Sequence, residues 1–153
     1  MLSLDRLSAR ASVRLLIDHL DHVALLEQYS RSAGTSGQLW SVFIKLDLGS
    51  KRAGVPLNSR LHELVAAAES SKLIDIHGFY SYPARNANKW DIDGAISVLQ
   101  THIDCLIIAT KLLSDRSKPL VLAVGSSIMA RIIDKLPIHL PPNLQLEFIA
   151  GNQ

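Results

Sequence analysis

Short apolar runs alternate with amphipathic segments along nearly the whole chain. Runs of mostly apolar residues predict strands at 12–18, 39–48, 73–80, 119–125 and 144–151. Apolar positions at helical spacing predict helices at 19–31, 59–71, 91–115 and 127–136. Strands that alternate with helices indicate an α/β fold in which the strands pair in parallel. Two architectures satisfy this pattern: an open doubly wound sheet, and part of a (β/α) barrel.

The composition fits a single globular domain. The chain has 153 residues, of which 48% are hydrophobic and 20% are charged, so it can build one core. A net charge of +2 without a basic block gives no reason to expect nucleic acid or a membrane as a partner. Cys105 is the single cysteine and no secretory signal is visible, so we expect a cytoplasmic protein.

Polar residues and glycines gather where the predicted strands end. In either architecture the carboxyl ends of parallel strands meet at one rim, where functional sites lie. The residues that the strands would bring to this rim are Asp47, Gly49, Arg52, Tyr80, Ser81, Tyr82, Gly125, Ser126, Ser127, Gly151 and Asn152. A cation, an anion, phenols, hydroxyls and free backbone amides at one rim are typical of a site for a phosphorylated small molecule.

Two pairs of polar residues near the strand ends allow two interpretations each. Ser126 and Ser127 come between a strand and a helix, where backbone N–H groups bind an anion, or where a serine merely caps the helix. Lys45 and Asp47 are two positions apart and share one face of their strand. They form either an interior ion pair or a polar cluster beneath a cofactor.

Five segments in register resemble the fold-type III pyridoxal-phosphate (PLP) enzymes. The segment VFIKLDLGSKRAGV at 42–55 has their signature Lys-x-Asp-x-Gly-x-x-Arg-x-Gly. The other four are VRLLIDHLDHVALLE at 13–27, IHGFYSYPA at 76–84, LAVGSSIMA at 122–130 and LPPNLQLEFIAGN at 140–152. The chain looks like the D-serine dehydratase branch, with D-threonine aldolase and alanine racemase as more distant relatives.

The resemblance implies a partial (β/α)8 TIM-type barrel. The chain would supply about five parallel strands, the fourth to eighth of the family barrel. These would form one incomplete PLP-binding domain over 1–153, with 1–11 as a candidate disordered segment. It also implies PLP as cofactor and D-serine or another D-3-hydroxy amino acid as substrate. Enzymes of this branch eliminate water and yield pyruvate and ammonia, as D-serine ammonia-lyases of D-amino acid metabolism.

The resemblance also implies roles for residues at the rim. Arg52 would lie near the reactive side of the cofactor, and Tyr80 and Tyr82 would face its ring. Gly125, Ser126 and Ser127 would hold the phosphate, and Gly151 and Asn152 would complete the phosphate site. No catalytic residue is assigned, although Arg52 and Tyr82 are candidates.

The sequence also departs from the family pattern. In the family, the lysine that forms the internal aldimine belongs to the first barrel strand, and the zinc ligands lie near the C-terminus. This sequence contains neither that lysine nor those zinc ligands. Tyr82 stands where the family has a histidine, and Ile128 stands where the phosphate turn has a proline. We therefore expect a truncated, catalytically incompetent lyase domain without a metal site.

The alternative function is a non-catalytic phosphate- or PLP-binding α/β protein. An unrelated open-sheet hydrolase or nucleotide binder ranks last, because the sequence has no Gly-x-Ser-x-Gly elbow, Walker lysine loop or Gly-x-Gly-x-x-Gly. The expected partners are a D-amino acid and either a second copy of the chain or the missing part of the barrel.

Overall fold

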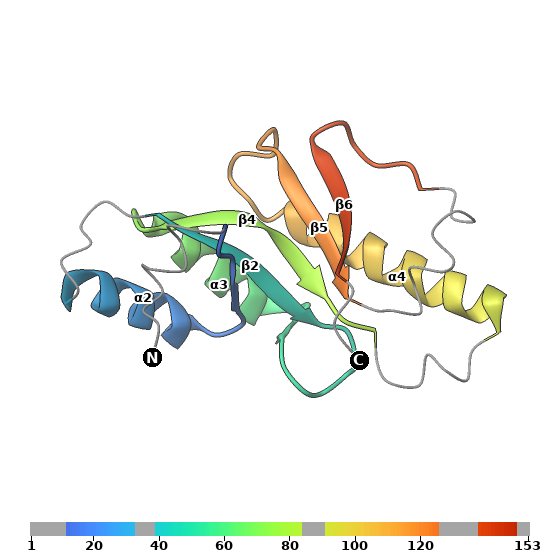
Figure 1. Ribbon diagram of the computed structural model, residues 1–153, viewed down its shortest axis with the longest axis horizontal. Helices are drawn as coiled ribbons and strands as arrows, with labels where there is room; N and C mark the ends of the chain where they lie inside the picture. Colours follow the sequence, from blue (N-terminus) through green and yellow to red (C-terminus); the bar gives the residue numbers. More distant parts are fainter. Residues whose placement is uncertain (1–11, 33–38, 84–90, 126–137, 150–153) are drawn as a thin grey trace.

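The computed structural model describes residues 12–32, 39–83, 91–125 and 138–149 (Figure 1). Its strands are β1 (Leu15–Ile17), β2 (Trp40–Asp47), β3 (Val55–Pro56), β4 (Ile74–Ser81), β5 (Leu120–Gly125) and β6 (Leu144–Ile149). Its helices are α2 (Leu20–Ser32), α3 (Ser59–Ser70) and α4 (Ile92–Thr110). The predicted helix at 127–136 and the segment 1–11 lie outside the described residues.

The strands form one parallel sheet in the order β1-β2-β4-β5-β6, and the short β3 pairs with β2. Neighbouring strands thus follow the order of the chain, apart from the two-residue β3. In Figure 1, α3 and α4 lie on one side of this sheet. A doubly wound sheet would reverse its strand order at a switch point and carry helices on both faces. The fold is therefore that of a partial TIM-type barrel.

The main core lies between the sheet and the helices. Alternate residues of β2, namely Val42, Ile44 and Leu46, are fully buried beneath the helices. Helix α4 is long and apolar enough to cross a membrane by length and composition. In this fold it buries residues such as Leu99 and Leu106 in the core and contacts β4 and β5. Packing in the core therefore explains why this helix is so apolar.

The opposite face of the sheet is concave. A smaller apolar cluster, containing Phe43 of β2 and Tyr80 of β4, lies on this face. Arg14, just before β1, reaches Glu147 of β6 with an N–O distance of 3.6 Å. In a flat sheet these two strands would be about 19 Å apart, because neighbouring strands are spaced by about 4.8 Å. The ion pair therefore requires the strong curvature of a barrel wall.

Local sequence signals explain where the elements begin and bend. Asn58 is the N-cap of α3, since its side chain accepts a hydrogen bond from the N–H of Arg60 over 3.0 Å. The register of β2 and β4 shifts between Val42 and Phe43. Gly78 lies opposite this irregularity, where a Cβ would overlap the carbonyl oxygen of Val121. Only glycine allows so close an approach of β4 to β5.

Candidate functional site

A pocket of about 440 Å³ opens at the carboxyl ends of β2 and β4. It is lined by Lys45, Ser50, Arg52, Ala53, Tyr80 and Tyr82. Arg52 comes from the loop after β2, whereas the two tyrosines come from the end of β4 and the residue following it. The structure therefore brings three of the predicted site residues together, from two separate parts of the chain.

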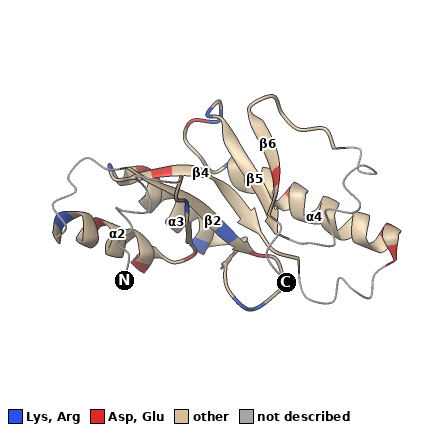
Figure 2. Cartoon of the chain, in the orientation of Figure 1, with Lys and Arg blue, Asp and Glu red and all other residues tan. Residues whose placement is uncertain are grey.

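Lys45 contributes a positive charge to the pocket from the concave face of β2. Its Nζ atom lies 5.7 Å from the centre of the Tyr80 ring, a cation–π geometry. Within the described part of the chain Lys45 makes no ion pair with Asp47, so of the two interpretations the interior ion pair is wrong. Figure 2 shows basic segments on β2 and on the loop after it. The pocket is therefore suited to an anionic ligand.

Asp47 organises the loop that carries Arg52. Its Oδ1 atom accepts hydrogen bonds from the N–H of Gly49 at 3.1 Å, the hydroxyl of Ser50 at 3.0 Å and the N–H of Lys51 at 3.1 Å. Partial desolvation alone would raise the pKa of Asp47, but these hydrogen bonds outweigh it and leave the pKa below its ordinary value. Asp47 therefore stays charged and shapes the loop, rather than facing a ligand.

Gly125 lies at the end of β5, against the two tyrosines. A Cβ at this position would overlap the hydroxyl of Tyr80 and come within 3.0 Å of the Tyr82 ring. Burial raises the pKa of Tyr80, and the neighbouring Tyr82 raises it further, so the phenol stays protonated. Gly125 thus forms the wall behind the tyrosines. Its absent side chain leaves space for their rings.

Gly125 and Arg52 both border Tyr80 and Tyr82. They therefore lie toward the same rim, as the sequence predicts. Four further residues predicted for the phosphate site, namely Ser126, Ser127, Gly151 and Asn152, lie outside the described residues. Their roles stay predictions. Within the described residues, no group of three or more metal-ligating side chains is present.

Ser81 does not face the pocket, contrary to the prediction that the third strand brings it to the rim. It is buried on the opposite face of β4, where its hydroxyl lies 3.0 Å from Nδ1 of His102 on α4. Burial lowers the pKa of His102. Successive residues of a strand point to opposite faces, so Tyr80 and Tyr82 take the pocket side and Ser81 takes the helix side.

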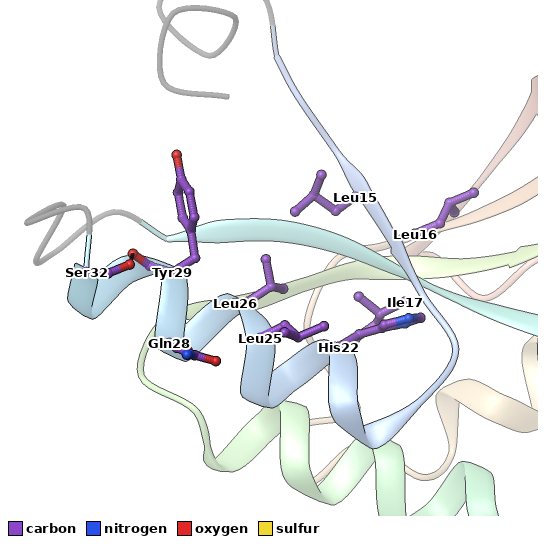
Figure 3. Close-up of a pocket in the computed structure, with 9 residues that line it drawn as sticks. All are labelled: Leu15, Leu16, Ile17, His22, Leu25, Leu26, Gln28, Tyr29 and Ser32. Atoms are coloured by element: carbon purple, nitrogen blue, oxygen red, sulfur yellow. Dashed lines mark hydrogen bonds between the residues drawn. The ribbon is translucent and has the colours of Figure 1, made fainter. Parts of the chain in front are cut away.

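A second hollow, of about 550 Å³, lies between β1 and α2 (Figure 3). Its lining is mostly apolar and includes Leu15 and Ile17 of β1, and Leu25 and Leu26 of α2. The side chain of Leu25 is 58% exposed. Its lining contains Tyr29 but no lysine or arginine, and it shares no residue with the rim pocket, so it is not part of the same site.

Residues 3–136 match the family described as alanine racemase, N-terminal domain. The D-serine dehydratase of Schizosaccharomyces pombe is 32% identical over 146 residues, which are 92% of this chain and 35% of that protein. The D-serine dehydratase of Saccharomyces cerevisiae is 31% identical over 135 residues, which are 81% of this chain and 31% of that protein. The chain thus spans about a third of the length of these relatives.

Solved structures show the same fold. An alanine racemase-like protein from Idiomarina loihiensis superposes with a TM-score of 0.64 and 20% identity, over 83% of this chain and 34% of the other. The concave parallel sheet and the position of the pocket at its rim are consistent with these matches. The chain belongs to the alanine racemase N-terminal domain family of fold-type III PLP proteins, in which it is D-serine dehydratase-like.

Proposed function

We propose that the chain binds PLP in the rim pocket and forms the cofactor-binding part of a D-serine dehydratase-like lyase. The observation that carries this proposal is the convergence of Arg52, Tyr80 and Tyr82 on one pocket. Its volume of about 440 Å³ falls within the usual range of small-molecule sites, about 300–1,000 Å³. PLP supplies an electron sink for reactions of amino acids when it is bound.

The residues of the pocket suit the different parts of this cofactor. Arg52 carries a planar set of N–H donors that matches phosphate or phenolate oxygens. Tyr82, whose side chain is 40% exposed, offers an aromatic surface to a planar ring. Lys45 adds a second positive charge beside Tyr80. In this proposal Ser126 and Ser127 would hold the phosphate, and Gly151 and Asn152 would complete its site.

The proposed substrate class is D-3-hydroxy amino acids, with D-serine as the first candidate, because both curated relatives are named D-serine dehydratases. Activity would require residues beyond the third of those proteins that this chain matches. The chain alone would then bind PLP in the cytoplasm without turning over a D-amino acid. The alternative is a binding protein that never acts in catalysis, and D-serine turnover after addition of the remaining barrel would argue against it.

The proposed partner is the polypeptide that completes the barrel. In the described residues β1 pairs on one side only, with β2, and Leu16 on its concave face is 50% exposed. The apolar hollow of Figure 3 adjoins this strand. A strand paired to β1, followed by a helix in the hollow, would cover both surfaces. Size-exclusion chromatography of the chain mixed with the rest of the barrel tests this: co-elution supports the proposal, separate elution contradicts it, and a discrete dimer of the chain alone favours a second copy instead.

A titration with PLP, followed by its absorbance, tests the proposed site. We expect saturable binding that Arg52→Ala weakens at least tenfold, because one charge-assisted contact contributes about 1.5–3 kcal/mol. Arg60→Ala is the matched control, since Arg60 is exposed and lies outside the rim pocket. Equal PLP affinity of the two variants would contradict the proposal. Borohydride should fix no PLP to the chain, whereas a reduced adduct would reveal a competent lysine.

A further inference from the structure

The loop that carries Arg52 has a backbone conformation that few sequences adopt. Residues 48–54 connect β2 to β3, and three of them have left-handed backbone angles: φ is +110° at Gly49, +51° at Lys51 and +126° at Gly54. Such angles are disfavoured for residues with a Cβ, so a loop of this kind keeps one shape only where contacts hold it. These contacts therefore decide where Arg52 lies.

Asp47 holds the first half of this loop, and a residue from another strand holds the second half. Gly54 donates its N–H to Oδ2 of Asp18 over 2.7 Å, although the two are 36 positions apart in the chain. Asp18 directly follows β1. A Cβ on Gly54 would lie 2.5 to 2.8 Å from backbone atoms of Leu46 and Asp47, so the loop is pressed against the end of β2. Asp18 fixes the loop two residues after Arg52.

Among the described residues, the side chain of Arg52 has no such anchor of its own. It is exposed, and among the described residues no carboxylate lies within ion-pairing distance of it. Its direction is therefore set by the loop backbone. Asp18 does not line the rim pocket, and its second carboxylate oxygen lies 3.3 Å from Nδ1 of His22. Asp18 thus acts on the site only through the loop.

We propose that Asp18 is a positioning residue whose hydrogen bond to Gly54 directs Arg52 toward the cofactor. The inference rests on the proposed function, because it assumes that Arg52 contacts PLP. It also links the edge strand β1 to the rim pocket, although β1 contributes no residue to that pocket. Losing the bond should loosen the loop while the helices and the sheet stay folded.

The first test measures the PLP affinity of the 153-residue chain. Asp18→Ala should weaken PLP binding about fivefold to tenfold, and Asp18→Asn, which keeps an acceptor oxygen, should restore most of this loss. In an Arg52→Ala background, Asp18→Ala should change the affinity less than twofold, because the residue to be positioned is gone. Asp21→Ala is the matched control, since this exposed carboxylate contacts His19 instead of the loop. Its PLP affinity should equal that of the unchanged chain.

Additive losses from Asp18→Ala and Arg52→Ala would overturn the inference, because they would show that Asp18 acts independently of Arg52. If Arg52→Ala binds PLP normally, both the proposed cofactor contact and the positioning role fail. If Asp18→Ala does not fold, Asp18→Glu replaces it, since one added methylene displaces the carboxylate but keeps its charge. The same comparison in the Arg52→Ala background then applies.

The second test needs no ligand. Hydrogen–deuterium exchange, read by mass spectrometry, should become at least tenfold faster over 49–54 in Asp18→Ala and stay unchanged in α3 and β4. Unchanged exchange over 49–54 would overturn the inference even if PLP binding is confirmed. Faster exchange together with no PLP binding in any variant would instead refute the proposed function and leave Asp18 only a structural role in the loop.

Discussion

Replacing Gly125 by alanine tests the packing of the rim directly. The added Cβ would overlap the hydroxyl of Tyr80 and approach the ring of Tyr82 to 3.0 Å. Both neighbours are side chains that can turn aside, so the chain should still fold. Overpacking of this kind costs about 1–3 kcal/mol. For a domain of this size, that corresponds to a melting temperature lower by roughly 2–12 °C.

The larger effect of Gly125→Ala should be on ligand binding. If both rings contact PLP and both are displaced, about 1 kcal/mol is lost for each ring, or roughly 30-fold in affinity. Gly78→Ala is the contrasting variant, because its Cβ would overlap the main-chain carbonyl of Val121, which cannot turn aside. It should unfold the domain, with a loss of about 4 kcal/mol or more. Melting curves of both variants measure the loss of stability, and PLP titrations measure the loss of affinity. Normal PLP affinity in a folded Gly125→Ala chain would refute the reasoning.

Three further predictions concern the buried and charged groups around the site. Ser81→Ala leaves Nδ1 of the buried His102 without its partner, so the free energy of unfolding in urea should fall by about 1–3 kcal/mol; an unchanged value would contradict the packing described. Burial lowers the pKa of His102, so the unfolded chain takes up a proton there first; the free energy of unfolding should fall as the pH drops below about 6.5, and less steeply in His102→Gln. Asp47→Ala removes three hydrogen bonds from the loop and should weaken PLP binding about tenfold, whereas wild-type affinity would show that the loop keeps its shape without them.

Much of the fold follows from the hydrophobic pattern. The strands at 39–48, 73–80 and 119–125 and the helices at 59–71 and 91–115 correspond to β2, β4, β5, α3 and α4, with shifts at their ends. The longest of these helices ends five residues earlier than predicted, at Thr110. Apolar residues continue past that position, because Leu113 also packs in the core as part of the following turn. The spacing of apolar residues indicates which positions are buried, and buried positions continue beyond the end of the helix.

Other features need contacts between distant residues. The strand β3 has two residues, Val55 and Pro56, which is too short to give a periodic signal, and it forms through pairing with Leu46 and Asp47. The choice between a doubly wound sheet and a barrel depends on which face each helix covers, and the spacing of apolar residues does not specify that.

The grouping of three rim residues was predictable from the sequence, whereas their roles at a site stay predictions. Arg52, Tyr80 and Tyr82 follow from the signature and the strand ends, and the structure places them together. The role of Asp18 is not visible in the sequence, because its partner Gly54 is 36 positions away. The direction of Ser81 does not follow from its position along the strand, because the carboxyl end of a strand carries side chains on both faces. The alternation of side chains in β4 was the signal that could have placed it on the helix side.

Comparing the binding of PLP with that of pyridoxal, which lacks the phosphate, tests the central claim most directly. If the rim pocket and the turn that follows Gly125 hold a phosphorylated cofactor, isothermal titration should show PLP binding at least tenfold more tightly than pyridoxal. Arg52→Ala should weaken the binding of both compounds, because Arg52 would lie at the reactive side of the cofactor rather than at its phosphate. Equal affinities for the two compounds, or no saturable binding of either, would contradict the account.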